Sequence, residues 1–214
     1  MTPILIGLTG RPDVGKDTLA SMLCAVGYRG TAFAQALYWE VSAGWRVDAS
    51  LLMARPTKEI ELPALAVAQC HDRGWIEYCA IQGHSLVAPR SPRWLLQEWG
   101  SYRRAQRPDY WVRHVQAWIH AQRAENRGAN LVITDVRMAN EAAMLRAHGG
   151  HILRIHRPDA RPLTGDTAAH DSERQAAAIQ ADADIQNDGS LARLAEHALQ
   201  AISALAHAPS LLQA

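Results

Sequence analysis

The sequence predicts an α/β fold built on a parallel sheet, and two observations lead to this prediction. Short apolar segments alternate with stretches whose apolar residues recur at helical spacing, as where residues 4–9 (ILIGLT) precede 16–26. Residues 131–136 (LVITDV) form a second apolar run without polar alternation, which is typical of a strand covered on both faces. In such folds, ligands bind outside the carboxyl ends of the strands.

The last third of the chain continues this alternation. We expect a helix over NEAAMLRAH that stops at Gly149 and Gly150, followed by a strand over HILRIHR. Further on, we expect a helix from about Asp171, a short strand at 183–186, a turn at NDG and a closing helix from Ser190. Strand and helix therefore alternate to the end of the chain.

The middle of the chain has a different character. Residues 34–127 are mostly helical in pattern and hold all seven tryptophans, so we interpret them as an insertion between the first strand–helix unit and the LVITDV strand. Residues from about 1 to 33 and from 128 to 214 then form the core of the domain, into which the helical segment is inserted. We treat the 214 residues as a single domain, because this length is enough to bury a sizeable core.

Composition and charge argue against several classes of protein. Lys and Arg total 22 against 21 Asp and Glu, and a net charge of +1 argues against a nucleic-acid coat or a polybasic membrane patch. No window approaches the roughly 18 apolar residues of a membrane span, and no basic n-region marks a secretion signal. Three cysteines without CxxC spacing fit a reducing compartment. We expect a cytoplasmic protein with neither nucleic-acid nor membrane partners.

Residues 10–18 (GRPDVGKDT) match the pattern G-x-x-x-x-G-K and lie between a buried strand and a helix, which is the context that a P-loop requires. Gly10 and Gly15 allow the backbone to wrap closely around a phosphate, and Lys16 reaches the β and γ phosphates. The predicted fold is thus that of P-loop NTPases. The predicted ATP-binding residues of the loop are Gly10, Asp13, Val14, Gly15, Lys16, Asp17 and Thr18.

Two aspartates are candidate magnesium ligands. Asp17 stands where the usual pattern has Ser or Thr, and Mg²⁺ accepts carboxylate oxygen readily. Thr18 remains available to hydrogen-bond the α phosphate. Asp135, at the end of LVITDV, is placed like the second acidic group of a P-loop enzyme. We therefore predict Asp17 and Asp135 as metal ligands, and Lys16 and Asp135 as catalytic residues.

Arginines supply the positive charge that a phosphoryl transfer requires. We expect Arg154, Arg157 and Arg161 to follow the fourth strand, in a loop placed like a mobile lid, with Arg154 and Arg157 catalytic. A second set is interleaved with aromatic residues that suit a nucleotide acceptor, because guanidinium groups grip phosphate and aromatic faces stack on bases. This set comprises Arg93, Arg103, Arg104 and Arg107, interleaved with Trp94, Trp99, Tyr102 and Trp111.

Six segments of the sequence together resemble the motifs of a known family. They are GRPDVGKDT with GKD, PRWLLQEWGSYRR followed by PDYW, ITDVRMANEA, HILRIHRP, HDSE and IQNDGS. In this order and spacing the chain resembles the deoxynucleoside monophosphate kinases encoded by tailed bacteriophages and prophages, from about residue 4 to 200. The resemblance implies a five-stranded parallel core with flanking helices, a helical monophosphate-binding insertion and a short lid over about 157–170. It also implies transfer of the γ-phosphoryl group of ATP to a dNMP with Mg²⁺, in the host cytoplasm if the chain is phage-encoded.

The resemblance also assigns residues to the two substrates. For the monophosphate it implies Arg93, Gln97, Arg103 and Arg104, and the aromatic cluster adds Trp111. Asp135 and Arg137 match the family's D-V-R, and we assign Arg137 to the monophosphate as well. His170, Ser172 and Glu173 match its H-x-S-E after the lid, whereas Asn187 and Gly189 match the N-x-G turn near the adenine of ATP.

Two other functions remain open at this point. One is a different P-loop small-molecule kinase, such as a dephospho-coenzyme A or phosphomevalonate kinase, although the arginine and aromatic cluster favours a nucleotide acceptor. The other is a nucleotide switch, which would bind ATP without responding to a monophosphate. The sequence leaves the oligomeric state open, and we allow for a homodimer.

Overall fold

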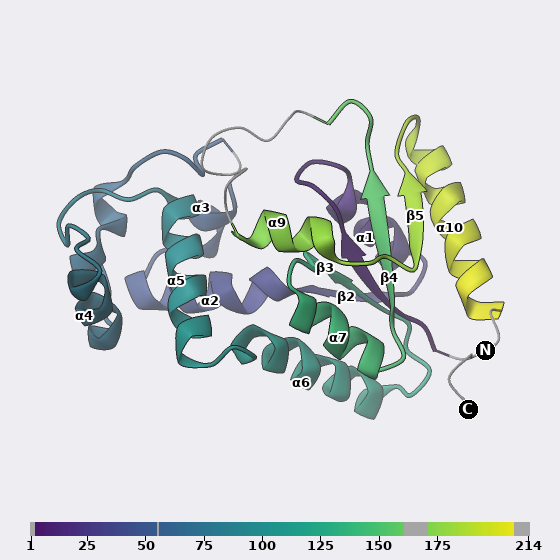
Figure 1. The fold of residues 1–214 in the computed structure, drawn as a ribbon, viewed down its shortest axis with the longest axis horizontal. Helices are drawn as coiled ribbons and strands as arrows, with labels where there is room; N and C mark the ends of the chain where they lie inside the picture. The colour runs from purple at the N-terminus through teal and green to yellow at the C-terminus, as the bar shows by residue number, and fades with distance from the viewer. Residues whose placement is uncertain (1–2, 55, 161–170, 208–214) are drawn as a thin grey trace. The chain divides into compact units, whose positions relative to one another are not determined.

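The computed structural model describes residues 3–54, 56–160 and 171–207, and only the backbone of 171–173. Five strands form one parallel sheet in the order β2-β3-β1-β4-β5 (Figure 1). The strands are β1 (Leu5–Thr9), β2 (Arg29–Ala32), β3 (Leu131–Thr134), β4 (His151–His156) and β5 (Ala183–Gln186). This confirms the predicted parallel five-stranded α/β fold.

The chain divides into two compact units, one of residues 1–33 with 115–214 and one of residues 34–114. The first, which we call the sheet unit, holds all five strands. Its helices are α1 (Lys16–Ala25), most of α6 (Tyr110–Glu125), α7 (Ala139–Ala147), α9 (Asp171–Ala178) and α10 (Leu191–His207). The second unit, the helical unit, ends within α6, whereas the sequence suggested a boundary after that helix.

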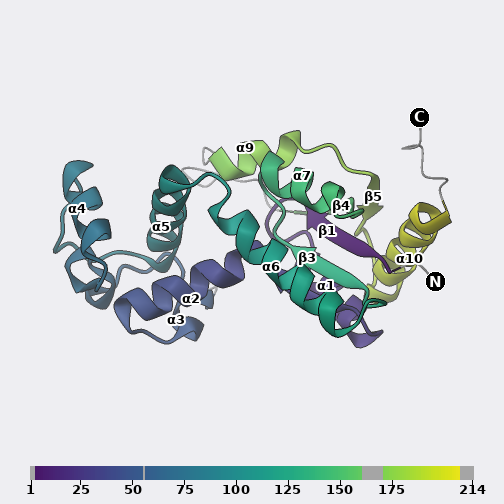
Figure 2. The same cartoon turned by 90° about the horizontal axis from the view of Figure 1, so that it is seen from below.

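Helices cover both faces of the sheet because its strands are apolar on both faces. Ile6 and Leu8 of β1 belong to a core with residues of α1 and α10. The other face of β1 meets α7 closely: a Cβ atom at Gly7 would lie 2.6 Å from Leu145 Cδ1, so a larger residue there would require the Leu145 side chain to shift. Figure 2 shows α7 and α9 on one side of the strands and α1 and α10 on the other.

The edge strand β2 is the element that the apolar pattern did not predict. Its sequence RGTA lacks an apolar run, and its residues are half-buried or exposed. Backbone pairing with β3, from Arg29 opposite Leu131 to Ala32 opposite Thr134, holds it in the sheet. A strand at the edge of a sheet needs less apolar surface than a central one, so its sequence carries a weaker signal.

The helical unit contains most of the helices of the insertion. They are α2 (Phe33–Trp45), α3 (Ala49–Met53), α4 (Arg73–Ile81) and α5 (Pro92–Gln106), with two short 3₁₀ helices at Pro63–Leu65 and Val67–Gln69. Three buried indoles pack edge to face at its centre, with Trp45 centred 6.0 Å from Trp75 and 5.5 Å from Trp99. The tryptophans therefore give this unit a core of its own.

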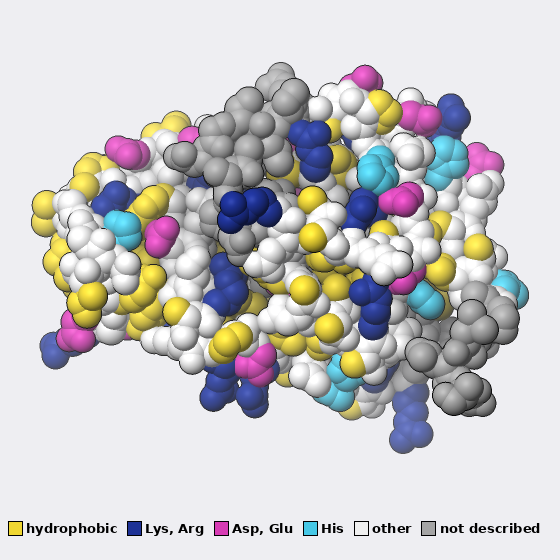
Figure 3. All heavy atoms as spheres, in the orientation of Figure 1, with side chains coloured by type: hydrophobic (Ala, Val, Ile, Leu, Met, Phe, Trp, Pro, Cys, Tyr) yellow, Lys and Arg dark blue, Asp and Glu magenta, His cyan; other side chains and the backbone are white. Residues whose placement is uncertain are grey.

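None of the helices in the described part of the chain combines the length and the apolar character needed to cross a membrane. On the face shown in Figure 3, Lys and Arg side chains are interspersed with Asp and Glu rather than gathered in one stripe.

Candidate active site

The loop between β1 and α1 has the geometry of a phosphate-binding cradle. Gly10 has φ +133° and Gly15 φ +104°, conformations that side chains disfavour, and a Cβ atom at Gly10 would lie 2.6 Å from the carbonyl oxygen of Ile155. Lys16 begins α1 and is only 7% exposed, and its Nζ donates to the carbonyl oxygens of Gly10 (2.8 Å) and Arg11 (2.7 Å). An ammonium group and a helix N-terminus thus meet at one loop, which suits an anion.

Two aspartates near this loop adopt left-handed backbone conformations, Asp13 with φ +62° and Asp135 with φ +61°. Such strain is unusual outside glycine and is common at functional sites. Asp135 directly follows β3, and its carboxylate lies 3.7 Å from the guanidinium of Arg137. The hydroxyl of Thr9 donates to the carbonyl oxygen of Val136 (2.8 Å), which ties the carboxyl ends of β1 and β3 together.

Glu141 shapes the turn that carries Asp135 and Arg137, a role that the sequence did not indicate. Its buried carboxylate accepts hydrogen bonds from the backbone N–H groups of Arg137 (2.7 Å) and Met138 (3.0 Å), at the start of α7. The acidic residue three positions after the helix N-cap is the signal that could have identified it.

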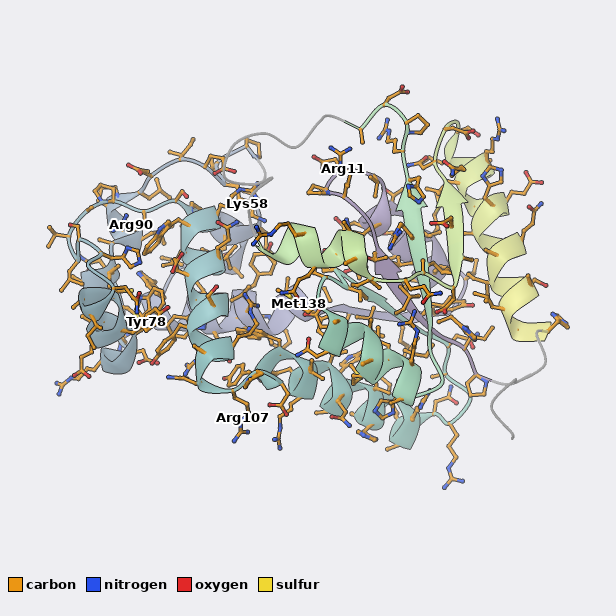
Figure 4. All side chains as sticks on the ribbon, in the orientation of Figure 1. Arg11, Lys58, Tyr78, Arg90, Arg107 and Met138 are labelled. Atoms are coloured by element: carbon orange, nitrogen blue, oxygen red, sulfur yellow. The ribbon has the colours of Figure 1, made fainter. Side chains whose placement is uncertain are left out.

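A cavity of about 670 Å³ lies beside the P-loop within the sheet unit. The end of β4, β5 and α9 form the rest of its wall, and four arginines line it: Arg11, Arg154, Arg157 and Arg174. Figure 4 shows Arg11 projecting from the loop between β1 and α1. Arg174 was not predicted from the sequence, because it lies on a helix 17 residues beyond Arg157 and only the fold brings the two to one cavity.

The predicted position of Arg154 was wrong. It lies within β4 rather than in a loop after it, and its guanidinium donates to the carbonyl oxygen of Ile179, just beyond α9. Arg154 also lines the cavity, yet this hydrogen bond anchors the C-terminal end of α9. Arg161 and His170, together with most of the predicted lid, lie outside the described residues, as do the side chains of Ser172 and Glu173.

The turn after β5 reaches the P-loop through Asn187. Its side-chain amide donates to the carbonyl oxygen of Val14 (2.8 Å), and its backbone N–H donates to the carbonyl oxygen of His156 (2.7 Å). Gly189 follows in the same turn, before α10. Asp17 and Thr18 lie in the first turn of α1, where a carboxylate interacts favourably with the helix dipole.

In the helical unit, Arg103 is the centre of a polar cluster. Its guanidinium bonds Glu40 (3.1 Å) and Asp72 (3.4 Å) and lies 4.7 Å from the centroid of the Trp99 ring. Glu40 also accepts from Trp99 Nε1 (2.9 Å) and from the hydroxyl of Tyr110 (2.6 Å). Burial, and then the bond to Glu40, raise the pKa of Tyr110. The cluster links α2, α5 and α6 through one carboxylate.

The other predicted acceptor residues of the helical unit lie on α5 and α6. Arg93 pairs with Glu59, and Arg104 contacts the Ser101 hydroxyl at 3.5 Å, while Gln97 is half-buried. Trp111 is only 4% exposed, and its indole N–H donates to the carbonyl oxygen of Gly100 (3.2 Å). Its ring is therefore part of the core of the helical unit.

Comparison with known proteins gives the family. The sequence profile of deoxynucleotide monophosphate kinases matches residues 90–198, just over half of the chain. The chain belongs to the deoxynucleotide monophosphate kinase family. Membership makes it an ATP-dependent kinase that acts on nucleotides, and the alternative of a switch without kinase activity is set aside.

The fold also has counterparts among solved structures. The Thermus thermophilus protein TT1252 is 20% identical at a TM-score of 0.50, over 95% of this chain and 98% of that one. The dephospho-CoA kinase from Campylobacter jejuni is 12% identical at a TM-score of 0.48, over 96% and 98%. A search of curated protein sequences gave no match.

Proposed function

We propose that this kinase transfers the γ-phosphoryl group of ATP to a deoxynucleoside monophosphate, giving a deoxynucleoside diphosphate and ADP. The observation that supports the donor half is the P-loop, in which Lys16 and the N-terminus of α1 face one anion site. The family profile supports a nucleotide acceptor. The reaction uses ATP and deoxynucleotides, which are cytoplasmic metabolites.

On the donor side, the P-loop amides and Lys16 hold the β and γ phosphates, and Thr18 hydrogen-bonds the α phosphate. Arg157, Arg174 and Arg11 surround the cavity beside the loop. Guanidinium groups at that position neutralise charge that spreads over the transferring phosphoryl group. Arg154 acts indirectly, because it anchors the helix that carries Arg174.

We propose that Asp17, in the first turn of α1, and Asp135, directly after β3, are the carboxylates that would hold Mg²⁺. Among the described residues, no three His, Cys, Asp or Glu side chains gather in a cluster. Mg²⁺ at a nucleotide site takes one or two carboxylates and draws its other ligands from phosphates and water, so Asp17 and Asp135 supply enough. When bound, the ion neutralises phosphate charge and orients the γ-phosphoryl group.

We propose that the helical unit binds the acceptor through Arg93, Gln97, Arg103 and Arg104 of α5. Arg137, in the sheet unit, pairs with the candidate magnesium ligand Asp135. The attacking atom is a phosphate oxygen of the acceptor. It forms a bond to the γ phosphorus while the bond from that phosphorus to the β,γ-bridging oxygen breaks, and the electrons leave with ADP. A phosphate oxygen is already an adequate nucleophile, so no general base is required.

The test is to incubate the protein with magnesium ATP and each of dGMP, dTMP, dCMP and dAMP, with the matching ribonucleotides alongside, and to separate the products by chromatography. We expect equal amounts of ADP and a diphosphate, formed only when a monophosphate is present. ATP hydrolysis that no monophosphate accelerates would contradict the proposed acceptor. The Lys16→Ala variant controls for contaminating kinases.

A further inference from the structure

The turn after β5 holds the P-loop in place through one side chain. Asn187 Nδ2 donates to the carbonyl oxygen of Val14 across 173 residues of sequence, at 2.8 Å. The backbone of Asn187 is itself fixed, since its N–H donates to the carbonyl oxygen of His156 at 2.7 Å. Asn187 therefore joins the end of β4, the end of β5 and the P-loop.

The direction of this hydrogen bond determines what the loop presents to a ligand. The carbonyl of Val14 and the N–H of Gly15 belong to the same planar trans peptide, so they point in opposite directions. Because the carbonyl points toward Asn187, the N–H of Gly15 points away from it. In a P-loop, backbone N–H groups bind phosphate when they converge on the inside of the loop.

Glycine at position 15 makes this orientation easy to lose. Gly15 has φ +104°, and a glycine rotates between positive and negative φ at little cost, so the peptide before it can flip. The same glycine is what allows the contact, since a Cβ atom there would lie 2.7 Å from Asn187 Nδ2. The loop thus pairs a flexible peptide with one external group that fixes it.

We propose that Asn187 is a positioning residue for the phosphate cradle: it locks the Val14–Gly15 peptide with the Gly15 N–H directed at the nucleotide phosphates. The inference rests on the proposed donor site and differs from the role near the adenine that the sequence suggested. It predicts that Asn187 matters for any ligand with a polyphosphate chain, whether or not a base is attached.

The test is isothermal calorimetry of the whole protein with magnesium ATP and with inorganic tripolyphosphate. For Asn187→Ala we expect both affinities to fall by a similar factor, about threefold to tenfold, the range expected for one neutral hydrogen bond. In steady-state kinetics, the KM for ATP should rise by the same factor, while the KM for the monophosphate stays constant. The isosteric N187D cannot donate to Val14, and it should lose at least as much.

Asn130→Ala is the matched control. The side chain of Asn130 makes a similar single bond, accepting from the backbone N–H of Ile4 at 2.9 Å, at the end of the sheet away from the P-loop. We expect N130A to lose stability in urea, as N187A does, but to keep wild-type affinity for both probes.

Three results would overturn the proposal. The first is unchanged affinity for both probes in both Asn187 variants. The second is a loss of affinity for ATP with no loss for tripolyphosphate, which would indicate that Asn187 contacts the base. The third is an equal loss of affinity in N130A, which would indicate a general loosening of the fold. A wild-type protein that binds tripolyphosphate but phosphorylates no monophosphate would contradict the proposed function and leave this inference standing.

Discussion

Removing the carboxylate of Glu40 should weaken the helical unit more than any single surface change. Glu40 accepts three hydrogen bonds, from Trp99 Nε1, Arg103 Nε and the Tyr110 hydroxyl. Bonds to a charged group contribute about 1.5–3 kcal/mol each, but the side chains of Glu40 and Arg103 are 21% exposed, so water replaces part of the loss. For Glu40→Ala we expect about 2–4 kcal/mol of lost stability, and for Glu40→Gln about 1–2 kcal/mol.

Urea unfolding followed by tryptophan fluorescence measures this loss, because six of the seven tryptophans lie in residues 34–114. Glu59→Ala is the control: Glu59 pairs with Arg93 but is 65% exposed, so its loss should cost at most about 1 kcal/mol. If Glu40→Ala lowered the free energy of unfolding no more than Glu59→Ala does, the polar cluster would not hold α2, α5 and α6 together.

Three further predictions concern other parts of the chain. Lys16→Ala should lower kcat by about a hundredfold or more, because a charge that stabilises the transition state is lost. The free energy of unfolding in urea should change by only about 1 kcal/mol. Unchanged turnover would contradict the assignment of Lys16 to the ATP site. Burial raises the pKa of Cys70 to about 11 and of Cys79 to about 12, whereas Cys24 is exposed, so one thiol per folded chain should react rapidly with Ellman's reagent and all three after denaturation. Rapid reaction of all three in the folded protein would contradict this. Burial, and then the nearby His120 and Arg123, lower the pKa of His148 from its ordinary value of 6.5. The unfolded state therefore binds more protons at this site, and the free energy of unfolding should fall as the pH is lowered through about 6.5. His148→Gln should flatten that dependence, and an equally steep curve in the variant would exclude His148 as its source.

Local sequence patterns predicted the elements that are marked by an apolar run or by helix-ending glycines. The run before Gly10 and the LVITDV segment became β1 and β3, buried along their whole length, and the glycines after α7 ended that helix where expected. Strand order has no such local signal. Leu5 pairs with Leu131, and Ile6 lies opposite both Val132 and His151, through contacts that span more than a hundred residues.

The site shows the same limit. The P-loop is contiguous, so its spacing revealed it, whereas Arg154 shows how proximity in sequence to a loop misleads. It alternates with Leu153 and Ile155 in β4, and the strand directs it toward the end of α9. The positions of Arg174 and Asn187 could not be predicted from local patterns, because only the tertiary structure brings them close to the P-loop. Asn187 bonds Val14, and Arg174 lines the cavity beside the loop.

The most direct measurement of the central claim follows the phosphoryl group itself. ATP labelled at the γ phosphate is incubated with the protein, Mg²⁺ and dGMP, dTMP, dCMP or dAMP in turn, with Lys16→Ala in parallel. We predict that the label appears at the β phosphate of a deoxynucleoside diphosphate, and that the variant nearly abolishes this transfer. Label that is released only as inorganic phosphate, or that is transferred equally well by the variant, would contradict a deoxynucleoside monophosphate kinase built on this P-loop.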